Sequence, residues 1–176
     1  MTVGTDTAEA AWGGEFEAFY ARQLPRMLRY CLMLGLPSHA AQDVTQEAFV
    51  QVLRRWPTID DHAAYLRTTA YHLAIKRPVE EPAPDLAGHR RAPQIVPELA
   101  GWEERHAIVR ACQQLSCQQQ AVFALHYDGY RDGEIAAILG MNPVTARSHL
   151  RHARENLRAW WDREGNDSPG RRGQLR

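Results

Sequence analysis

Four arginines near the C-terminus constrain the fold of this chain more than any other feature. Their intervals are four, three and four residues: Arg147, Arg151, Arg154 and Arg158. That spacing places all four on one face of a helix. Small and apolar residues one position earlier form a second stripe about a quarter turn away, namely Ala146, Leu150, Ala153 and Leu157. We therefore expect a helix that buries one side and presents guanidinium groups on the adjacent side.

The segment before this helix is also informative. Residues 134–139 are mostly apolar and are followed by Gly140 and Pro143. Glycine commonly ends a helix and proline commonly begins one. A short helix, a tight turn and a basic helix form the helix-turn-helix pattern, whose second helix fits the major groove of DNA. The alternative is a solvated arginine face on an ordinary bundle helix, but the turn and the stripe together favour DNA binding.

The charge of the chain is balanced overall and uneven locally. Lys and Arg total 21, as do Asp and Glu, so the net charge gives no global signal for nucleic acid. Residues 143–159 nevertheless hold four arginines and one glutamate, whereas residues 78–101 hold four acids and two arginines. A local basic patch is what phosphate contact requires.

The fold class predicted from periodicity is all-α. Three helices are expected in the first part of the chain: residues 16–34, which Pro25 interrupts, residues 38–57 with Ser38 as the cap, and residues 62–77.

Residues 78–101 contain five prolines and two glycines without periodicity, which indicates a linker. Helical periodicity resumes at Trp102, and Ser116 with Gln119 predicts a capping box for a later helix. The predicted organisation is a disordered tail over 1–14, a helical domain over 15–77, a linker over 78–101, a helix-turn-helix domain over 102–163 and a disordered tail over 164–176.

Two helices of the first domain carry patterned faces. On the second helix, an inward stripe comprises Val44, Ala48, Val52 and Trp56, and a polar stripe comprises Asp43, Gln46, Glu47, Val50 and Arg54. The polar stripe is either a solvated face or a docking face for another protein. On the third helix, one ridge comprises Tyr65, Thr68, Thr69, His72 and Lys76. Such a ridge is either a mixed polar surface or a platform that stacks unpaired bases and holds phosphates.

Other features narrow the class of protein. Cys31 and Cys112 lie on apolar faces and are expected to be buried thiols, and with Cys117 they show no zinc spacing. No His, Cys or Asp set has catalytic or metal spacing, so we expect neither an enzyme nor a cofactor. No apolar run approaches the ~20 residues of a membrane span. Residues 1–14 lack the apolar core of a signal peptide. A cytoplasmic protein is expected.

These residues match a known family. The segments Asp43-Val-Thr-Gln-Glu-Ala-Phe49, Arg54-Arg55-Trp56 and Ala64-Tyr-Leu-Arg67 resemble region 2 of the extracytoplasmic-function (ECF) sigma factors of bacterial RNA polymerase. The segments Glu134-Ile-Ala-Ala-Ile-Leu-Gly140 and Thr145-Ala-Arg147-Ser148 resemble region 4. Response regulators share the style of the second half only.

The resemblance implies roles for particular positions. Contact with the β′ clamp of core polymerase is implied for Asp43, Gln46, Glu47, Val50 and Arg54. Contact with the melted minus-10 element is implied for Trp56, Tyr65, Thr69, His72 and Lys76. Reading of the minus-35 duplex is implied for Thr145, Arg147, Ser148, His149, Arg151, His152 and Arg154. The implied partners are core polymerase, through its β′ clamp and β flap, and promoter DNA, with no membrane insertion. Members of this family also commonly bind an anti-sigma factor, which is usually a separate chain, and this sequence does not identify one.

The chain also departs from the family at specific positions. The family often has Arg-Asn where Tyr71 and His72 stand, and arginine is common where His149 and His152 stand. The alternative function is a stand-alone helix-turn-helix regulator that never engages core polymerase. The polar stripe of the second helix discriminates between the two, because such a regulator has no need of it.

Overall fold

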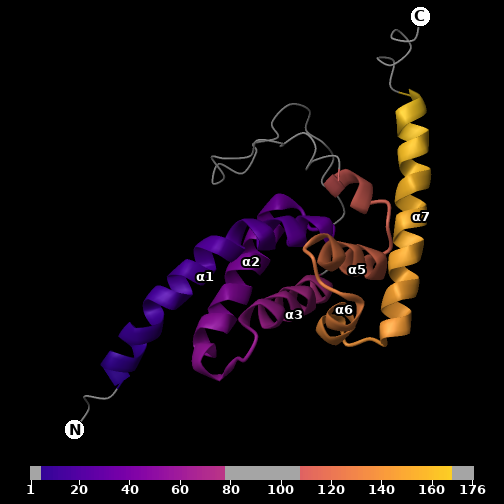
Figure 1. The fold of residues 1–176 in the computed structure, drawn as a ribbon. Coiled ribbons are helices and arrows are strands. Elements are labelled where there is room, and N and C mark those ends of the chain that lie inside the picture. The colour runs from indigo at the N-terminus through magenta and orange to yellow at the C-terminus, as the bar shows by residue number, and fades with distance from the viewer. Residues whose placement is uncertain (1–4, 78–107, 168–176) are drawn as a thin grey trace, which may run out of the picture. The chain divides into compact units, whose positions relative to one another are not determined.

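The described part of the protein is helical. The structure is a computed structural model that describes residues 5–77 and 108–167, and all regular structure in those ranges is helix (Figure 1). The helices form two compact units, each with its own core. The all-α prediction is confirmed. The linker predicted over 78–101, together with Trp102, lies outside the described residues.

The first unit contains three α-helices and one short 3-10 turn. Their bounds are α1 (Thr5–Met33), α2 (Ser38–Arg54), η1 (Trp56–Thr58) and α3 (His62–Lys76). Pro25 lies inside α1, and the helix continues across it. Asp61 caps α3, because its Oδ1 accepts a hydrogen bond from the Ala64 backbone N–H at 2.9 Å.

The structure corrects three helix boundaries of this unit. α1 begins at Thr5, inside the tail predicted over 1–14, in a stretch rich in alanine, the best helix former. Ser38 is the first residue of α2 rather than its cap, and the cap position, Pro37, makes no side-chain capping bond. α2 ends at Arg54, and Pro57, which lacks a backbone N–H, lies in η1.

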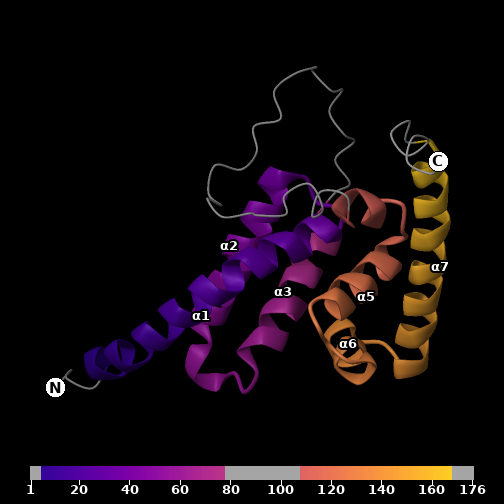
Figure 2. The ribbon, with the colours of Figure 1, turned by 45° about the horizontal axis from the view of Figure 1, so that its top comes forward.

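An aromatic cluster joins the helices of the first unit. The rings of Phe16 and Phe19 from α1 each lie 5.2 Å from the ring of Trp56, measured between centroids, in edge-on geometry. Phe49 of α2 packs edge-on against both phenylalanines. α2 and α3 lie side by side (Figure 2), and Leu66 of α3 is fully buried. These contacts bury the face of α2 that the sequence assigned to the interior.

The second unit contains the helix-turn-helix. Residues 108–112 are helical, and α5 (Cys117–Tyr127), α6 (Asp132–Leu139) and α7 (Pro143–Asp167) follow. The backbone N–H of Ser116 donates to Gln119 Oε1 at 3.3 Å, as the predicted capping box requires. α7 packs against both α5 and α6 (Figure 2). It extends four residues past the domain boundary predicted at residue 163.

The turn between α6 and α7 follows from three residues. Gly140 ends α6 with a φ of 64°, a left-handed conformation that costs other residues roughly 1 kcal/mol or more. Asn142 Oδ1 accepts a hydrogen bond from the Val144 N–H at 2.8 Å and so satisfies a free donor at the start of α7. The glycine stop and proline start predicted from the sequence are confirmed, and they fix the direction in which α7 leaves α6.

Candidate nucleic-acid interface

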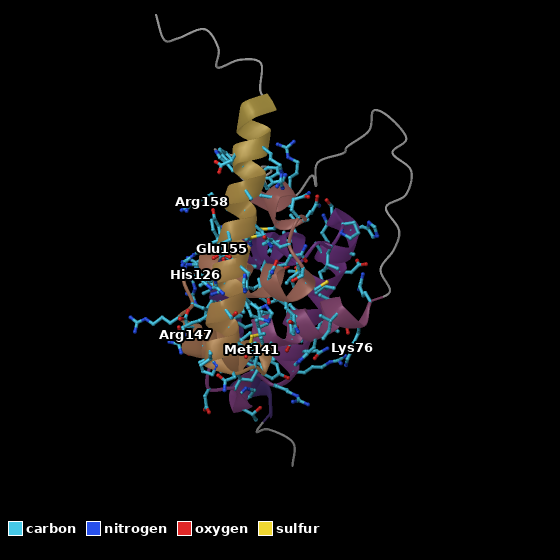
Figure 3. The ribbon with its side chains drawn as sticks, turned by 90° about the vertical axis from the view of Figure 1, so that its right-hand side faces the viewer. Lys76, His126, Met141, Arg147, Glu155 and Arg158 are labelled. Atoms are coloured by element: carbon cyan, nitrogen blue, oxygen red, sulfur yellow. The ribbon has the colours of Figure 1, made fainter. Side chains whose placement is uncertain are left out.

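The arginine stripe of α7 is exposed, as the sequence predicted. All four arginines are exposed, whereas Ala146, Leu150 and Ala153 on the adjacent side are buried against α5 and α6. Figure 3 shows the labelled Arg147 and Arg158 on the same side of α7. The apolar stripe therefore attaches the helix to the unit and leaves the guanidinium groups accessible.

The first turns of α7 present further polar groups. Thr145 and Ser148 are exposed, Val144 is 64% exposed and His149 is half-buried. The N-terminal residues of a recognition helix contact base edges in helix-turn-helix complexes. The exposure of these residues fits that use, and Val144 adds an apolar group suited to a thymine methyl.

Arg151 is held within α7. Its Nη1 lies 3.2 Å from Glu155 Oε1, and its Nη2 lies 3.3 Å from His152 Nε2. Glu155 Oε2 in turn lies 3.3 Å from His152 Nδ1. One carboxylate thus offsets part of the positive charge of the stripe.

Arg154 is held from another helix. Its Nη2 lies 2.6 Å from Nε2 of His126 on α5. Both residues line a groove of about 630 Å³ on the second unit, together with Asp132 from the start of α6 and the other three stripe arginines. His126 belongs to this surface although the sequence analysis did not select it, because its neighbour is 28 residues away along the chain.

The polar stripe of α2 is exposed as predicted. Its five members are all exposed: Asp43, Gln46, Glu47, Val50 and Arg54. Beside them Leu53 is 36% exposed, so Val50 has an apolar neighbour that the sequence analysis assigned no role. Asp43 forms an ion pair with Arg77 across 3.5 Å, which ties this face to the C-terminal end of α3.

The structure separates the residues that the resemblance assigned to the minus-10 element. His72 and Lys76 are exposed and Tyr65 is half-buried. Trp56 and Thr69, in contrast, are buried, with 7% and 8% of their surface accessible. Both side chains pack inside the unit and leave little surface for a direct contact with DNA.

The loop before α3 is ordered around Trp56. The ring of His62 stacks on the ring of Trp56 with centroids 3.8 Å apart, and His62 Nε2 lies 2.9 Å from the Trp56 carbonyl oxygen. Because a carbonyl only accepts, Nε2 carries the proton and donates. Trp56 therefore holds the loop in place through its contacts with His62. Sequence spacing alone does not predict these contacts.

The buried thiols serve packing. Burial raises the pKa of Cys31 to about 11, partly offset by a hydrogen bond from the Thr45 hydroxyl to its sulfur at 3.5 Å. Burial raises the pKa of Cys112 to about 12. Both thiols are neutral near pH 7, as core residues should be, and Cys117 is exposed.

Two absences can be stated for residues 5–77 and 108–167. No three His, Cys, Asp or Glu side chains there gather into a possible metal site. No helix in those ranges is long and apolar enough to cross a membrane.

The second unit, with its exposed basic helix after a tight turn, places the protein in the helix-turn-helix class of DNA-binding proteins. Family comparison makes this specific. The model of sigma-70 region 2 matches residues 19–77, and that of sigma-70 region 4 matches residues 105–157. The chain belongs to the sigma-70 family, in the two-region form of the ECF sigma factors.

Individual relatives are more distant. The probable RNA polymerase sigma factor RfaY of Xanthomonas campestris pv. campestris is 27% identical over 133 residues, which are 68% of this chain. That alignment is 33% of the relative, so the chain spans about a third of its length. The solved structure of CnrH in complex with the cytosolic domain of CnrY has a TM-score of 0.64 at 21% identity, over 92% of this chain and 96% of that one, and shares the fold. A chain of the RsbN–BldN complex is 22% identical with a TM-score of 0.36, over 88% and 97% of the two chains.

Proposed function

We propose that this protein directs bacterial RNA polymerase to specific promoters as an initiation subunit without chemistry of its own. One observation carries the proposal: the same chain presents an exposed acidic and apolar face on α2 and an exposed arginine face on a helix-turn-helix. The first suits a protein partner and the second suits duplex DNA. A promoter-specificity subunit needs both.

The docking face is proposed to be the polar stripe of α2. Val50 and Leu53 offer apolar surface, and the charged side chains of Asp43, Glu47 and Arg54 lie beside it on the same stripe. An apolar centre with a charged rim is the usual anatomy of a protein interface. The expected partner surface on core polymerase is therefore apolar at its centre, with basic groups placed opposite Asp43 and Glu47, and the family assigns this contact to the β′ clamp.

Promoter reading is proposed to be divided between the units. In the second unit, α7 enters the major groove of the minus-35 element, with Arg147 and Ser148 nearest the bases and Arg151 close behind. In the first unit, the exposed ridge of His72 and Lys76 meets the melted minus-10 strand, with Tyr65 beside it. Trp56 and Thr69 support this surface from inside rather than touching DNA.

Further partners and the place of action follow from the family. CnrH was solved with the cytosolic domain of CnrY, and we propose that an anti-sigma factor likewise binds this chain and competes with polymerase. Polymerase and chromosomal DNA are cytoplasmic in bacteria, so the protein acts there. The stand-alone regulator is disfavoured, since the region 2 match covers residues 19–77, including the whole of α2.

The proposal is tested by reconstitution with core polymerase. Promoter fragments selected by the holoenzyme from genomic or randomised DNA should support run-off transcription only when the protein and core are both present. Reversing two charges on α2, with Asp43→Lys and Glu47→Lys, should abolish co-purification with core while circular dichroism still shows a helical fold.

The matched control reverses two exposed charges on α1, with Glu15→Lys and Glu17→Lys. This control should retain core binding, because the total charge changes equally and the α2 face stays intact. If the α2 double variant binds core with wild-type affinity, the docking face lies elsewhere. Specific duplex binding without any dependence on core would instead support the stand-alone regulator.

A further inference from the structure

The contact between Arg154 and His126 fixes the proton on the imidazole ring. A guanidinium group has only donors, so Arg154 Nη2 must donate to His126 Nε2 across the 2.6 Å between them. Nε2 then carries a lone pair, and the proton of the neutral ring lies on Nδ1. Among the residues that the structure describes, none accepts a hydrogen bond from that Nδ1–H.

The free Nδ1–H belongs to a residue of the arginine groove. His126 is half-buried and lines the groove with all four stripe arginines. Figure 3 shows the labelled His126 on the same side of α7 as Arg147, Glu155 and Arg158. Three helices therefore contribute to this surface: α7 with the arginines, α6 with Asp132 and α5 with His126.

The partners of Arg151 and Arg154 differ in charge. Glu155 neutralises part of the charge of Arg151 while holding it. Neutral His126 holds Arg154 without adding a negative charge of its own. An arginine that is oriented in advance and keeps its full charge is well suited to phosphate, because less side-chain freedom is lost on binding.

We propose that His126 is a positioning residue that presents Arg154 to a phosphate of the promoter duplex and donates its own Nδ1–H to the same backbone. Helix α5, which is not part of the helix-turn-helix, thereby contributes to the DNA-facing surface. The inference rests on the proposed function, since it requires duplex DNA at the arginine face. The contact is to the sugar-phosphate backbone and carries no base preference of its own.

The test compares four variants of the full chain in the reconstituted holoenzyme. The variants are His126→Leu, His126→Gln, Arg154→Ala and the double variant His126→Leu with Arg154→Ala. Two probes are used: a duplex selected by the wild-type holoenzyme from a randomised minus-35 library, and a duplex of unrelated sequence. Affinity is measured over a range of salt concentrations. Gln118→Leu, an exposed change on the same helix, is the matched control.

Arg154→Ala should reduce the slope of log affinity against log salt by about 0.9, the value for one phosphate contact. His126→Leu should weaken binding to both duplexes by about tenfold, in line with one lost charge-assisted hydrogen bond. His126→Gln should retain most of the affinity, because its amide can also accept from Arg154 and donate to phosphate. In the Arg154→Ala background, His126→Leu should have a clearly smaller effect than in the wild type.

Several outcomes would overturn the inference. Additive losses in the double variant would show that the two residues act independently. An unchanged salt slope in Arg154→Ala would show that Arg154 does not contact a phosphate. Equal losses in His126→Leu and Gln118→Leu would reduce His126 to a residue of the fold. If the wild-type holoenzyme binds no duplex, the proposed function itself is contradicted. If the wild type binds normally and the His126 variants keep its DNA affinity, only this inference is contradicted.

A direct measurement of the tautomer is independent of DNA. Long-range ¹⁵N–¹H NMR spectra of the protein should show His126 with its proton on Nδ1 and a lone pair on Nε2. Arg154→Ala should shift this tautomer balance. A ring that carries its proton on Nε2 in the wild type would contradict the hydrogen bond from which the inference starts.

Discussion

Neutralising Glu155 should strengthen DNA binding. The carboxylate of Glu155 lies 3.2 Å from Arg151 Nη1 and 3.3 Å from His152 Nδ1, so it sits within the surface that faces DNA. If Arg151 bridges Glu155 and a phosphate, the two negative charges are about 7 Å apart, and in water they repel by about 0.6 kcal/mol. Glu155→Gln should therefore raise the affinity for duplex DNA by about threefold.

The fold should tolerate this change. The side chains of Arg151 and Glu155 are 63% and 56% exposed, and ion pairs of such exposure contribute about 0–1 kcal/mol to stability. The melting temperature should consequently change little. The salt slope should steepen by up to about one phosphate contact, since Arg151 is no longer compensated within the helix.

The assay is anisotropy of labelled duplex titrated with holoenzyme at several salt concentrations, for the wild type and Glu155→Gln. Glu17→Gln on α1 is the control, because it changes the net charge equally at an exposed site outside α7. Weaker binding by Glu155→Gln at an unchanged melting temperature would refute the reasoning. It would mean that Glu155 orients Arg151 productively or accepts a hydrogen bond from a cytosine amino group.

Three other predictions concern base reading, strand separation and pH. Arg147→Ala should reduce the free energy of DNA binding by about 1–3 kcal/mol and relax the preference at one or two base pairs, whereas Arg158→Ala should lower the affinity for all sequences alike. Selecting promoter variants with each mutant separates these outcomes. His72→Ala should reduce open-complex formation more than closed-complex binding, and the loss in the free energy of opening should be about 1–3 kcal/mol if a base stacks on the ring. Footprinting on a pre-melted bubble template should show the same defect. Because the pKa values of Cys31 and Cys112 are raised to about 11 and about 12, their unfolded-state thiols ionise first, so stability is full below about pH 8.5 and falls as pH rises above it. Cys31→Ala and Cys112→Ala should flatten that alkaline loss in chemical denaturation, and an unchanged pH dependence in both would show that the thiols do not cause it.

The sequence by itself determined the local structure of the recognition element. Helical spacing, Gly140 and Pro143 predicted the turn, the buried side of α7 and the exposed row of arginines, and the structure confirms them. These features depend on backbone conformation and on a period of 3.6 residues, so neighbouring residues suffice to specify them. The family resemblance likewise rested on short local segments, and both sigma-70 region models match the chain.

Tertiary structure decided which side chains remain available. Trp56 and Thr69 belong by position to the proposed DNA-facing part of the first unit, yet packing buries them. Arg154 has its partner 28 residues away on α5, and Asp43 has its partner, Arg77, just after the end of α3. Helical spacing predicts which way a side chain points from its own helix, but it does not predict which side chains of a neighbouring helix will contact it. Only the packed helices therefore show which charged side chains have an acidic partner and which are held by a neutral one.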